Sequence, residues 1–244
     1  MKSVTILKTE ISVTSVDEVS RLLTEKKGLL VAVCNVNTLV SCYKNKVLNK
    51  IINSFDIRCP DGFPVAKSSK LLYKNQQNRV DGYNLFYETI KKGLEKNKSH
   101  YFFGNTDIVT SKMISKLKIE FPDINILGYT CPPVLNAENL SKDNYINDLK
   151  SKSPDIVWVS LGFPKQEQFI NKIKDEINLD SNLIGIGAVF EWVAGTKIKA
   201  PEFLANIGLE WIFRLIQEPK RLFRRYLIDN FLFIIYFVKQ YLSK

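Results

Sequence analysis

Short apolar runs alternate with stretches of helical spacing along this chain, and that alternation constrains its fold more than any other feature. Runs with the composition of buried strands occupy residues 28–36, 56–62, 99–105, 125–130, 155–162 and 182–190. Stretches with apolar residues at helical spacing lie between them, at 38–55, 82–97, 106–122 and 136–152. Strands that alternate with helices indicate a mostly parallel sheet covered by helices on both faces. The predicted fold class is therefore α/β.

The composition changes near Lys197. From Lys197 onward nine Lys or Arg stand against four Asp or Glu, a surplus of five that is half of the +10 net charge of the chain. The sequence therefore predicts a body, residues 1–196, and a helical C-terminal appendage, residues 197–244. The basic surplus favours a polyanion, an anionic membrane surface or a phosphorylated substrate as a partner.

The C-terminal appendage has the pattern of a basic amphipathic helix. Arginines and lysines at 214, 220, 221, 224 and 225 lie between apolar residues at helical spacing, and Pro219 is expected to break the helix in two. The apolar run 230–238 is about half the ~18 to 20 residues that span a bilayer. This pattern is typical of a membrane-surface helix, whereas an ordinary docked helix with a solvated basic face is the simpler alternative. No RNA-binding motif accompanies it, so no nucleic-acid partner is expected.

Cysteine and histidine usage excludes several kinds of site. The four cysteines form no CxxC pair, which argues against a zinc site and a disulfide framework and indicates a reducing, cytoplasmic setting. His100 is the only histidine, so a His-based triad or a multi-histidine metal site is excluded by count. No secretory signal is evident at the N-terminus. We expect no metal and no cofactor.

Four short segments that we interpret as strand ends are rich in polar residues. They are NVNT at 35–38, CPDG at 59–62, RVDG at 79–82 and GFPKQEQ at 162–168. Taken singly, each has a simple explanation as a turn, a helix cap or a surface ion pair. Taken together at one edge of a parallel sheet, they would line a crevice beyond the carboxyl ends of the strands, where α/β proteins bind ligands.

The segment IGIGAVF at 184–190 suggests a dinucleotide site, but the match is incomplete. Gly185 and Gly187 supply the first two glycines, whereas Phe190 stands at the third glycine position. No acidic strand end follows about twenty residues later, as the dinucleotide fingerprint requires. Close contact between a strand and a helix is the simpler reason for small residues here.

The order of these segments resembles the WecG/TagA/CpsF family of bacterial glycosyltransferases. The most specific blocks are GFPKQE at 162–167 and the stretch from Ala200 to Tyr226 that contains GLEW, RL, EP and RRY. The resemblance covers nearly the whole chain. It implies a Rossmann-like body whose appendage completes the site at the membrane.

The resemblance also implies an activity. Such enzymes transfer a hexose from a UDP-sugar to a polyprenyl-diphosphate-linked sugar on the inner face of the plasma membrane. They make intermediates of teichoic acids, capsules and exopolysaccharides, by an inverting reaction that uses no metal. A homo-oligomer that hides the appendage in solution is compatible with this pattern.

The residue roles that the resemblance implies fall into two groups. Asp61 matches the catalytic base, Arg214, Arg221 and Arg224 match the cations that stabilise the leaving diphosphate, and Asn37 is counted with this catalytic group because it is expected to orient the sugars. The residues implied to bind substrate include Arg79 and Gly82 near the nucleotide, Gln166 and Glu167 at uridine or ribose hydroxyls, Lys165 at phosphate, and Asn35 and Asn37 at the sugars. Three further positions of the matched blocks, Gly162, Gly187 and Glu191, are expected at the substrate.

Two departures from the family pattern leave the donor open. Asn84 stands where the family often has aspartate, and Glu191 replaces another aspartate. N-acetylmannosamine is the commonest donor sugar of the family, while glucose, a uronic acid or another hexose stays an alternative. A non-catalytic membrane-surface module with the same fold is the competing function.

Overall fold

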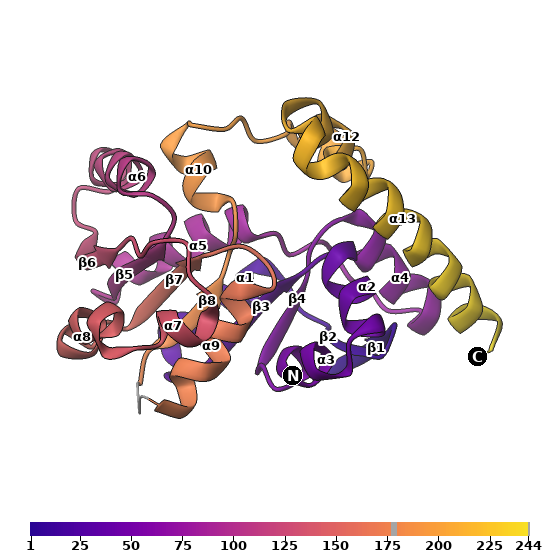
Figure 1. Cartoon of the computed structure of the whole chain (residues 1–244), viewed down its shortest axis with the longest axis horizontal. Coiled ribbons are helices and arrows are strands. Elements are labelled where there is room, and N and C mark those ends of the chain that lie inside the picture. Colours follow the sequence, from indigo (N-terminus) through magenta and orange to yellow (C-terminus); the bar gives the residue numbers. More distant parts are fainter. Residues whose placement is uncertain (177–179, 244) are drawn as a thin grey trace.

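The computed structural model describes residues 1–176 and 180–243, apart from the side chains of residues 143, 175, 176, 224 and 225. Its centre is a six-stranded sheet in the order β4-β3-β8-β7-β5-β6, in which all neighbouring strands are parallel (Figure 1). The strands are β3 (Leu30–Cys34), β4 (Ile57–Pro60), β5 (Ser99–Gly104), β6 (Asn125–Thr130), β7 (Ile156–Ser160) and β8 (Asn182–Gly185). The predicted α/β class with a mostly parallel sheet is confirmed.

Helices cover both faces of the sheet, because its central strands bury side chains on both sides. In β7, Val157 and Val159 enter one hydrophobic cluster while Ile156 and Trp158 enter the other. The first cluster is covered by α2 (Val36–Lys44), α3 (Lys46–Asn53), α4 (Phe63–Tyr73), α7 (Ala137–Leu140), α8 (Asp143–Lys152) and α9 (Lys165–Glu176). The second is covered by α1 (Val16–Glu25), α5 (Gly82–Leu94), α6 (Asp107–Glu120) and α10 (Val189–Ala194).

Polar caps set several helix boundaries. Thr106 caps α6 as predicted, since its side chain accepts from the backbone N–H of Val109. The predicted helix over 38–55 is two helices instead. Asn45 divides them, because it adopts an extended conformation and its side-chain oxygen accepts from the N–H groups of Val47 and Leu48. That cap starts α3 in a new direction.

One strand-end interpretation and the predicted extent of one strand are wrong. The segment RVDG does not follow a strand: Asp81 caps α5 and accepts from the N–H of Asn84, and Val80 only donates to Pro60 O at the end of β4. The apolar run 182–190 is β8 followed by the start of α10, because Gly187 at φ +57° turns the chain between them. An N-terminal hairpin, β1 (Ser3–Ile6) and β2 (Thr9–Ser12), was not predicted.

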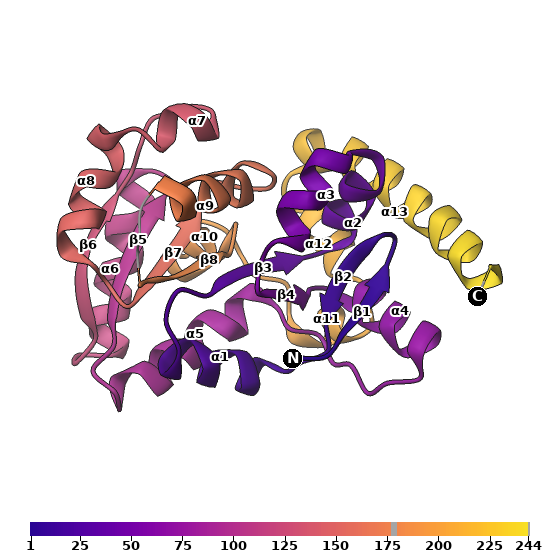
Figure 2. The same cartoon turned by 90° about the horizontal axis from the view of Figure 1, so that it is seen from below.

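The C-terminal appendage contains α11 (Glu202–Asn206), α12 (Glu210–Gln217) and α13 (Pro219–Leu242), and Pro219 separates the last two as predicted. Helix α13 lies along α2 (Figures 1 and 2), where Tyr236 stacks on Tyr43 with 4.2 Å between ring centroids. The Gln240 side chain bonds the hairpin backbone, accepting from Leu7 N and donating to Thr5 O, each at 2.9 Å. No helix in the described ranges is long and apolar enough to cross a bilayer.

Candidate active site

A cleft of about 360 Å³ opens where the carboxyl ends of the parallel strands meet the appendage. Residues directly after five of the strands line it: Asn35 after β3, Asp61 after β4, Asn105 after β5, Leu161 after β7 and Ile186 after β8. The appendage contributes Glu210, Arg214 and Arg221 to its lining. We call this cavity the main cleft. It lies where ligands of open α/β sheets bind, beyond the strand ends.

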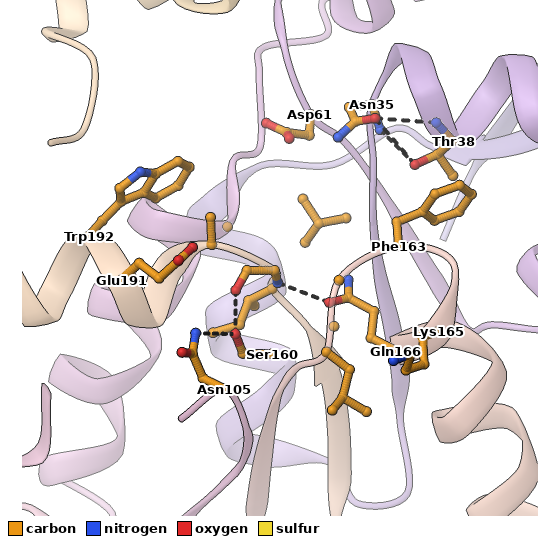
Figure 3. A pocket seen from close by; sticks show the side chains of 18 of the residues that line it. Asn35, Thr38, Asp61, Asn105, Ser160, Phe163, Lys165, Gln166, Glu191 and Trp192 are labelled. Atoms are coloured by element: carbon orange, nitrogen blue, oxygen red, sulfur yellow. Dashed lines mark hydrogen bonds between the residues drawn. The ribbon is translucent and has the colours of Figure 1, made fainter. Parts of the chain in front are cut away.

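Asp61 lies at one end of the main cleft (Figure 3). It follows the last residue of β4, and Asn35 follows the last residue of the neighbouring strand β3, so the two lie near each other. The backbone N–H of Asp61 donates to Cys34 O at 2.9 Å, which fixes the loop after β4. The pKa of Asp61 is raised to about 7: burial is the largest cause, the carboxylates of Glu210 and Asp81 act in the same direction, and Arg79 and Arg214 oppose the rise. A carboxyl group with this pKa exchanges protons near neutral pH, as a general base must.

Arg79 holds two of those carboxylates. Its guanidinium lies 2.9 Å from Glu210 Oε2 and 3.4 Å from Asp81 Oδ2, and all three side chains are largely buried. Arg79 is absent from the lining of the main cleft, whereas Asp81, Gly82 and Glu210 are present. The structure therefore places Arg79 behind the cleft wall, where it joins the body to α12.

Gln166 is the central side chain of the GFPKQEQ segment. It is buried in the first turn of α9, and its Oε1 accepts from the Gly187 N–H at 3.1 Å (Figure 3). A Cβ atom added to Gly185 would lie 2.9 Å from Gln166 Nε2. Gly185 therefore leaves room for this amide, and Gly187 donates a hydrogen bond to it. These contacts explain the glycines at both positions without a dinucleotide site.

The neighbours of Gln166 have different positions. Glu167 is buried and accepts from Gln166 Nε2 at 2.8 Å, but it does not line the main cleft. Lys165, at the start of α9, does line it, as does Gly162, whose φ of +76° favours glycine. Thus Gln166, Lys165 and Gly162 are in position to contact a ligand, and Glu167 orients Gln166.

The two asparagines of NVNT have separate roles. Asn35 caps α2 by accepting from the Thr38 N–H at 3.2 Å, and it lines the main cleft. Asn37 donates from Nδ2 to Asp229 Oδ2 of α13 at 2.6 Å and lies outside that cleft. It lines a second, smaller cavity of about 90 Å³, which we call the side pocket.

The opposite end of the main cleft contains residues that sequence reasoning missed. Ser160 donates to Gly187 O at 2.7 Å and receives a bond from Asn105 Nδ2 at 3.3 Å (Figure 3). The signal for both was available, since each stands at the carboxyl end of a predicted strand. Asp81 and Glu210 were also missed, the first because it caps a helix and the second because its contact with Arg79 joins distant segments.

Ion pairs connect the appendage to α10 and position Arg221 at the main cleft. Lys197 bridges Glu191 at 2.7 Å and Glu218 at 2.8 Å, and Arg221 pairs with Glu218. The Arg214 guanidinium lies over the Trp192 ring, 5.3 Å from its centroid. Glu191 and Trp192 of α10 thereby connect the body to α12 and α13. The side chain of Arg224 lies outside the described part of the structure.

Other possible centres lie elsewhere or are not formed. The single histidine, His100, is buried in β5, accepts from Trp158 Nε1 at 3.2 Å and does not line the main cleft. Within residues 1–176 and 180–243, no three His, Cys, Asp or Glu side chains gather so as to hold a metal ion. Among the described residues, the main cleft brings together the raised-pKa carboxyl group of Asp61, three appendage cations (Lys199, Arg214 and Arg221), Lys165 of the body and several amides.

Comparison with known proteins identifies the family. Residues 4–244 match the model of the Glycosyl transferase WecG/TagA/CpsF family. A Bacillus spizizenii N-acetylglucosaminyldiphosphoundecaprenol N-acetyl-beta-D-mannosaminyltransferase is 31% identical over 206 residues, which cover 82% of this chain and 75% of that protein. A Bacillus subtilis protein of the same name is 29% identical over 197 residues, covering 81% and 75%. The chain therefore belongs to the WecG/TagA/CpsF family and is a glycosyltransferase.

Proposed function

We propose that this enzyme transfers N-acetylmannosamine, or a related hexose, from a UDP-sugar to an N-acetylglucosamine attached to a polyprenyl diphosphate. The names of both Bacillus relatives support this acceptor and this sugar. The single observation that carries the proposal is the position of Asp61, a carboxyl group with a pKa of about 7 at the edge of a cavity that also presents Arg214 and Arg221.

Asp61 is the proposed general base. An inverting transfer is a single displacement, in which an acceptor hydroxyl loses its proton while its oxygen attacks the anomeric carbon of the donor. The ionised Asp61 carboxylate takes that proton, and the bond between the anomeric carbon and the UDP oxygen breaks. A positioned base contributes ~10²- to 10⁴-fold to such a step.

The leaving UDP gains negative charge, which the cleft is built to stabilise. Arg214 and Arg221 line the cleft from the appendage, and Lys165 lines it from the first turn of α9. The N-terminus of that 12-residue helix, which is the positive end of its dipole, lies at the same part of the lining. We propose that these groups replace the metal ion on which other sugar transfers rely, with Gln166 and Asn105 at the uridine or ribose hydroxyls.

The appendage also carries the proposed membrane contact. Helices α12 and α13 expose a series of large apolar side chains, among them Ile216 at 75% and Phe231 at 65% exposure. A soluble surface rarely exposes so many in one continuous region, and such patches mark protein or membrane interaction sites. We propose that this face rests on the inner leaflet of the plasma membrane, with the basic residues of α13 at the anionic headgroups.

The test is UDP release from a panel of UDP-sugars, with and without a lipid-diphosphate-linked N-acetylglucosamine, in a chelating buffer. We expect acceptor-dependent release from UDP-N-acetylmannosamine. Release from UDP-glucose or a UDP-uronic acid alone would reassign the donor. No release from any donor, together with UDP binding by calorimetry, would favour a non-catalytic module. Release only after a divalent cation is restored would contradict the metal-independent reaction.

A further inference from the structure

The side pocket shares a wall with the main cleft. Four residues line both cavities, namely Asn35, Asp61, Glu210 and Arg214. Asp61 is therefore accessible from two directions. In a displacement that inverts the anomeric carbon, the attacking hydroxyl and its base lie on the side of the donor sugar opposite to the leaving group. If UDP lies over the strand ends in the main cleft, the acceptor reaches Asp61 from the side pocket.

The side pocket has the chemistry of a small amide-binding site. Trp211 of α12 and Tyr226 of α13 form its aromatic part, with ring centroids 6.2 Å apart and a 69° angle between planes. Asn37 and Asn230 supply side-chain amides. The bond from Asn37 Nδ2 to Asp229 fixes that amide, so that Asn37 Oδ1 is the atom available to accept a donor.

The volume of the side pocket limits what it can hold. At about 90 Å³, against about 360 Å³ for the main cleft, the side pocket is the smaller of the two cavities and suits a ring substituent of a few non-hydrogen atoms. An acetamido group has that size, one N–H donor and one apolar methyl. Its N–H can donate a hydrogen bond to Asn37 Oδ1, and its methyl group can pack against the rings of Trp211 and Tyr226.

We propose that the side pocket binds the acetamido group of the acceptor sugar and thereby places a ring hydroxyl of that sugar at Asp61. This inference rests on the proposed function. The lipid part of the acceptor then leaves along the helices that form the pocket, since α12 and α13 expose Ile212, Phe223 and Leu227 to the outside. The specificity for an N-acetylhexosamine acceptor is thus built jointly, with the aromatic rings from the appendage and Asn37 from the start of α2 in the body.

The experiment compares three synthetic lipid-diphosphate acceptors that carry N-acetylglucosamine, N-propanoylglucosamine or glucose, with wild type, Trp211→Ala and Trp211→Phe. For wild type we expect kcat/KM to fall at least about tenfold with either altered acceptor, since one methylene group in a fitted pocket changes kcat/KM by ~10- to 200-fold. In Trp211→Ala the N-acetylglucosamine acceptor should fall to nearly the level of the glucose acceptor. Ile119→Ala, an exposed apolar side chain of α6 that lines neither cavity, is the control.

The outcomes separate this inference from the proposed function. Equal use of the N-acetylglucosamine and glucose acceptors by wild type would overturn the inference and leave the transferase activity intact. Loss of discrimination between N-acetylated and plain UDP-hexose donors in Trp211→Ala would assign the pocket to the donor and also overturn it. No transfer by wild type to any acceptor would overturn both. UDP affinity measured by calorimetry should be the same in Trp211→Ala and Ile119→Ala, and wild-type discrimination alone tests the inference if Trp211→Ala fails to fold.

Discussion

At the scale of single residues, the site depends on how neighbouring groups adjust one carboxyl. Asp61 has a titration point near neutrality because burial and two further carboxylates oppose its ionisation, whereas Arg79 and Arg214 limit the effect. A base must be ionised to accept a proton yet basic enough to hold it, and a pKa close to the working pH meets both demands. The proposed role of Asp61 as a base therefore depends on the neighbouring groups that set its pKa as well as on the carboxylate itself.

The first prediction concerns the pH dependence of the enzyme. Because the pKa of Asp61 is raised to about 7, kcat/KM should rise with pH through about 7 and fall about tenfold per unit below it. Asp61→Asn should lower kcat ~10²-fold or more while UDP affinity is largely kept. Steady-state kinetics and calorimetry measure both. Asp123→Asn, a fully solvated surface change, is the control, and wild-type turnover in Asp61→Asn would contradict the assignment.

The second prediction tests the contact between Gly185 and Gln166. Gly185→Ala places a Cβ against the Gln166 amide and should cost ~1–3 kcal/mol in the free energy of unfolding. In a Gln166→Ala background the same change should cost clearly less, since the opposing atoms are gone. Denaturant unfolding of the two single variants and the double variant measures the coupling. Additive costs would mean that Gln166 is not what excludes a side chain from position 185.

At the scale of elements, α12 joins the two parts of the site. Glu210 pairs with Arg79 of the body, and Arg214, one helical turn later, lies over the Trp192 ring and lines the main cleft with it. In addition, Phe63, two residues after Asp61, packs so closely on Gly208 that a Cβ there would lie 3.0 Å from its ring. The loop that carries the base is therefore in direct contact with the turn that begins α12.

The third prediction follows from the charge of Glu210. Its carboxylate raises the pKa of Asp61, so Glu210→Gln should lower that pKa and move the acid limb of the kcat/KM profile to lower pH. Release of Arg79 from its ion pair acts in the same direction, because Arg79 favours the ionised Asp61. Glu202→Gln, an exposed carboxylate of the same appendage, should leave the limb in place. A limb that moves to higher pH in Glu210→Gln would contradict the electrostatic account.

Elements that bury both faces could be predicted, and elements fixed by distant contacts could not. The strands β3, β5 and β7 follow from continuous apolar runs, and Thr106 and Pro219 indicate helix boundaries by local chemistry. The N-terminal hairpin was missed because Leu7 and Lys8 adopt positive φ without a glycine or asparagine to indicate a turn. Of the candidate site, Asp61 and Gln166 could be located as strand-end residues.

The positions of the remaining site residues could be found only from the three-dimensional structure. Arg79 was expected near the nucleotide, yet its partners Asp81 and Glu210 hold it behind the cleft wall. Glu210 stands 131 positions after Arg79, and no local pattern connects residues so far apart. Trp211 and Tyr226 resembled ordinary aromatic residues of an amphipathic tail, because only the crossing of α12 and α13 brings their rings together.

At the scale of the whole molecule, the main cleft has one wall from the body and another from the appendage. The body supplies Asp61 and the strand-end amides, whereas the appendage supplies the arginines and the exposed apolar face. Helix α13 is nevertheless docked, since Phe233 is buried in the core and Tyr236 stacks on Tyr43. The proposed function thereby assigns both the leaving-group cations and the membrane contact to one segment, residues 197–244.

The fourth prediction is that truncation after Lys199 separates folding from catalysis. The sheet and both hydrophobic clusters are built almost wholly from earlier residues, so the body should keep its far-UV circular dichroism spectrum and a cooperative melt. Transfer should be lost because Arg214 and Arg221 are removed. A lowered melting temperature is expected from the loss of Phe233 from the core. Wild-type turnover by the truncated chain would contradict the role of the appendage arginines.

The fifth prediction concerns attachment to membranes. Phe231 and Ile234 are 65% and 60% exposed and lie three residues apart on α13, so the double change Phe231→Ser with Ile234→Ser should weaken co-sedimentation with anionic vesicles. Ile119→Ser, 81% exposed on α6, is the control. Binding should also fall as salt is added, because the basic residues of the appendage act through screened charges. Equal sedimentation of the two variants would contradict the proposed contact face.

The hydrogen bond between Leu7 and Gln240 has a consequence for the order of folding. It joins residues 233 positions apart, so its formation requires the closure of almost the entire chain. Contacts of such long range become favourable only after nearer ones have shortened the loop between them. Helix α13 therefore docks late when the chain folds, and it detaches early when the chain unfolds. We expect the amide hydrogens of α13 to exchange with solvent well before those of the central strands.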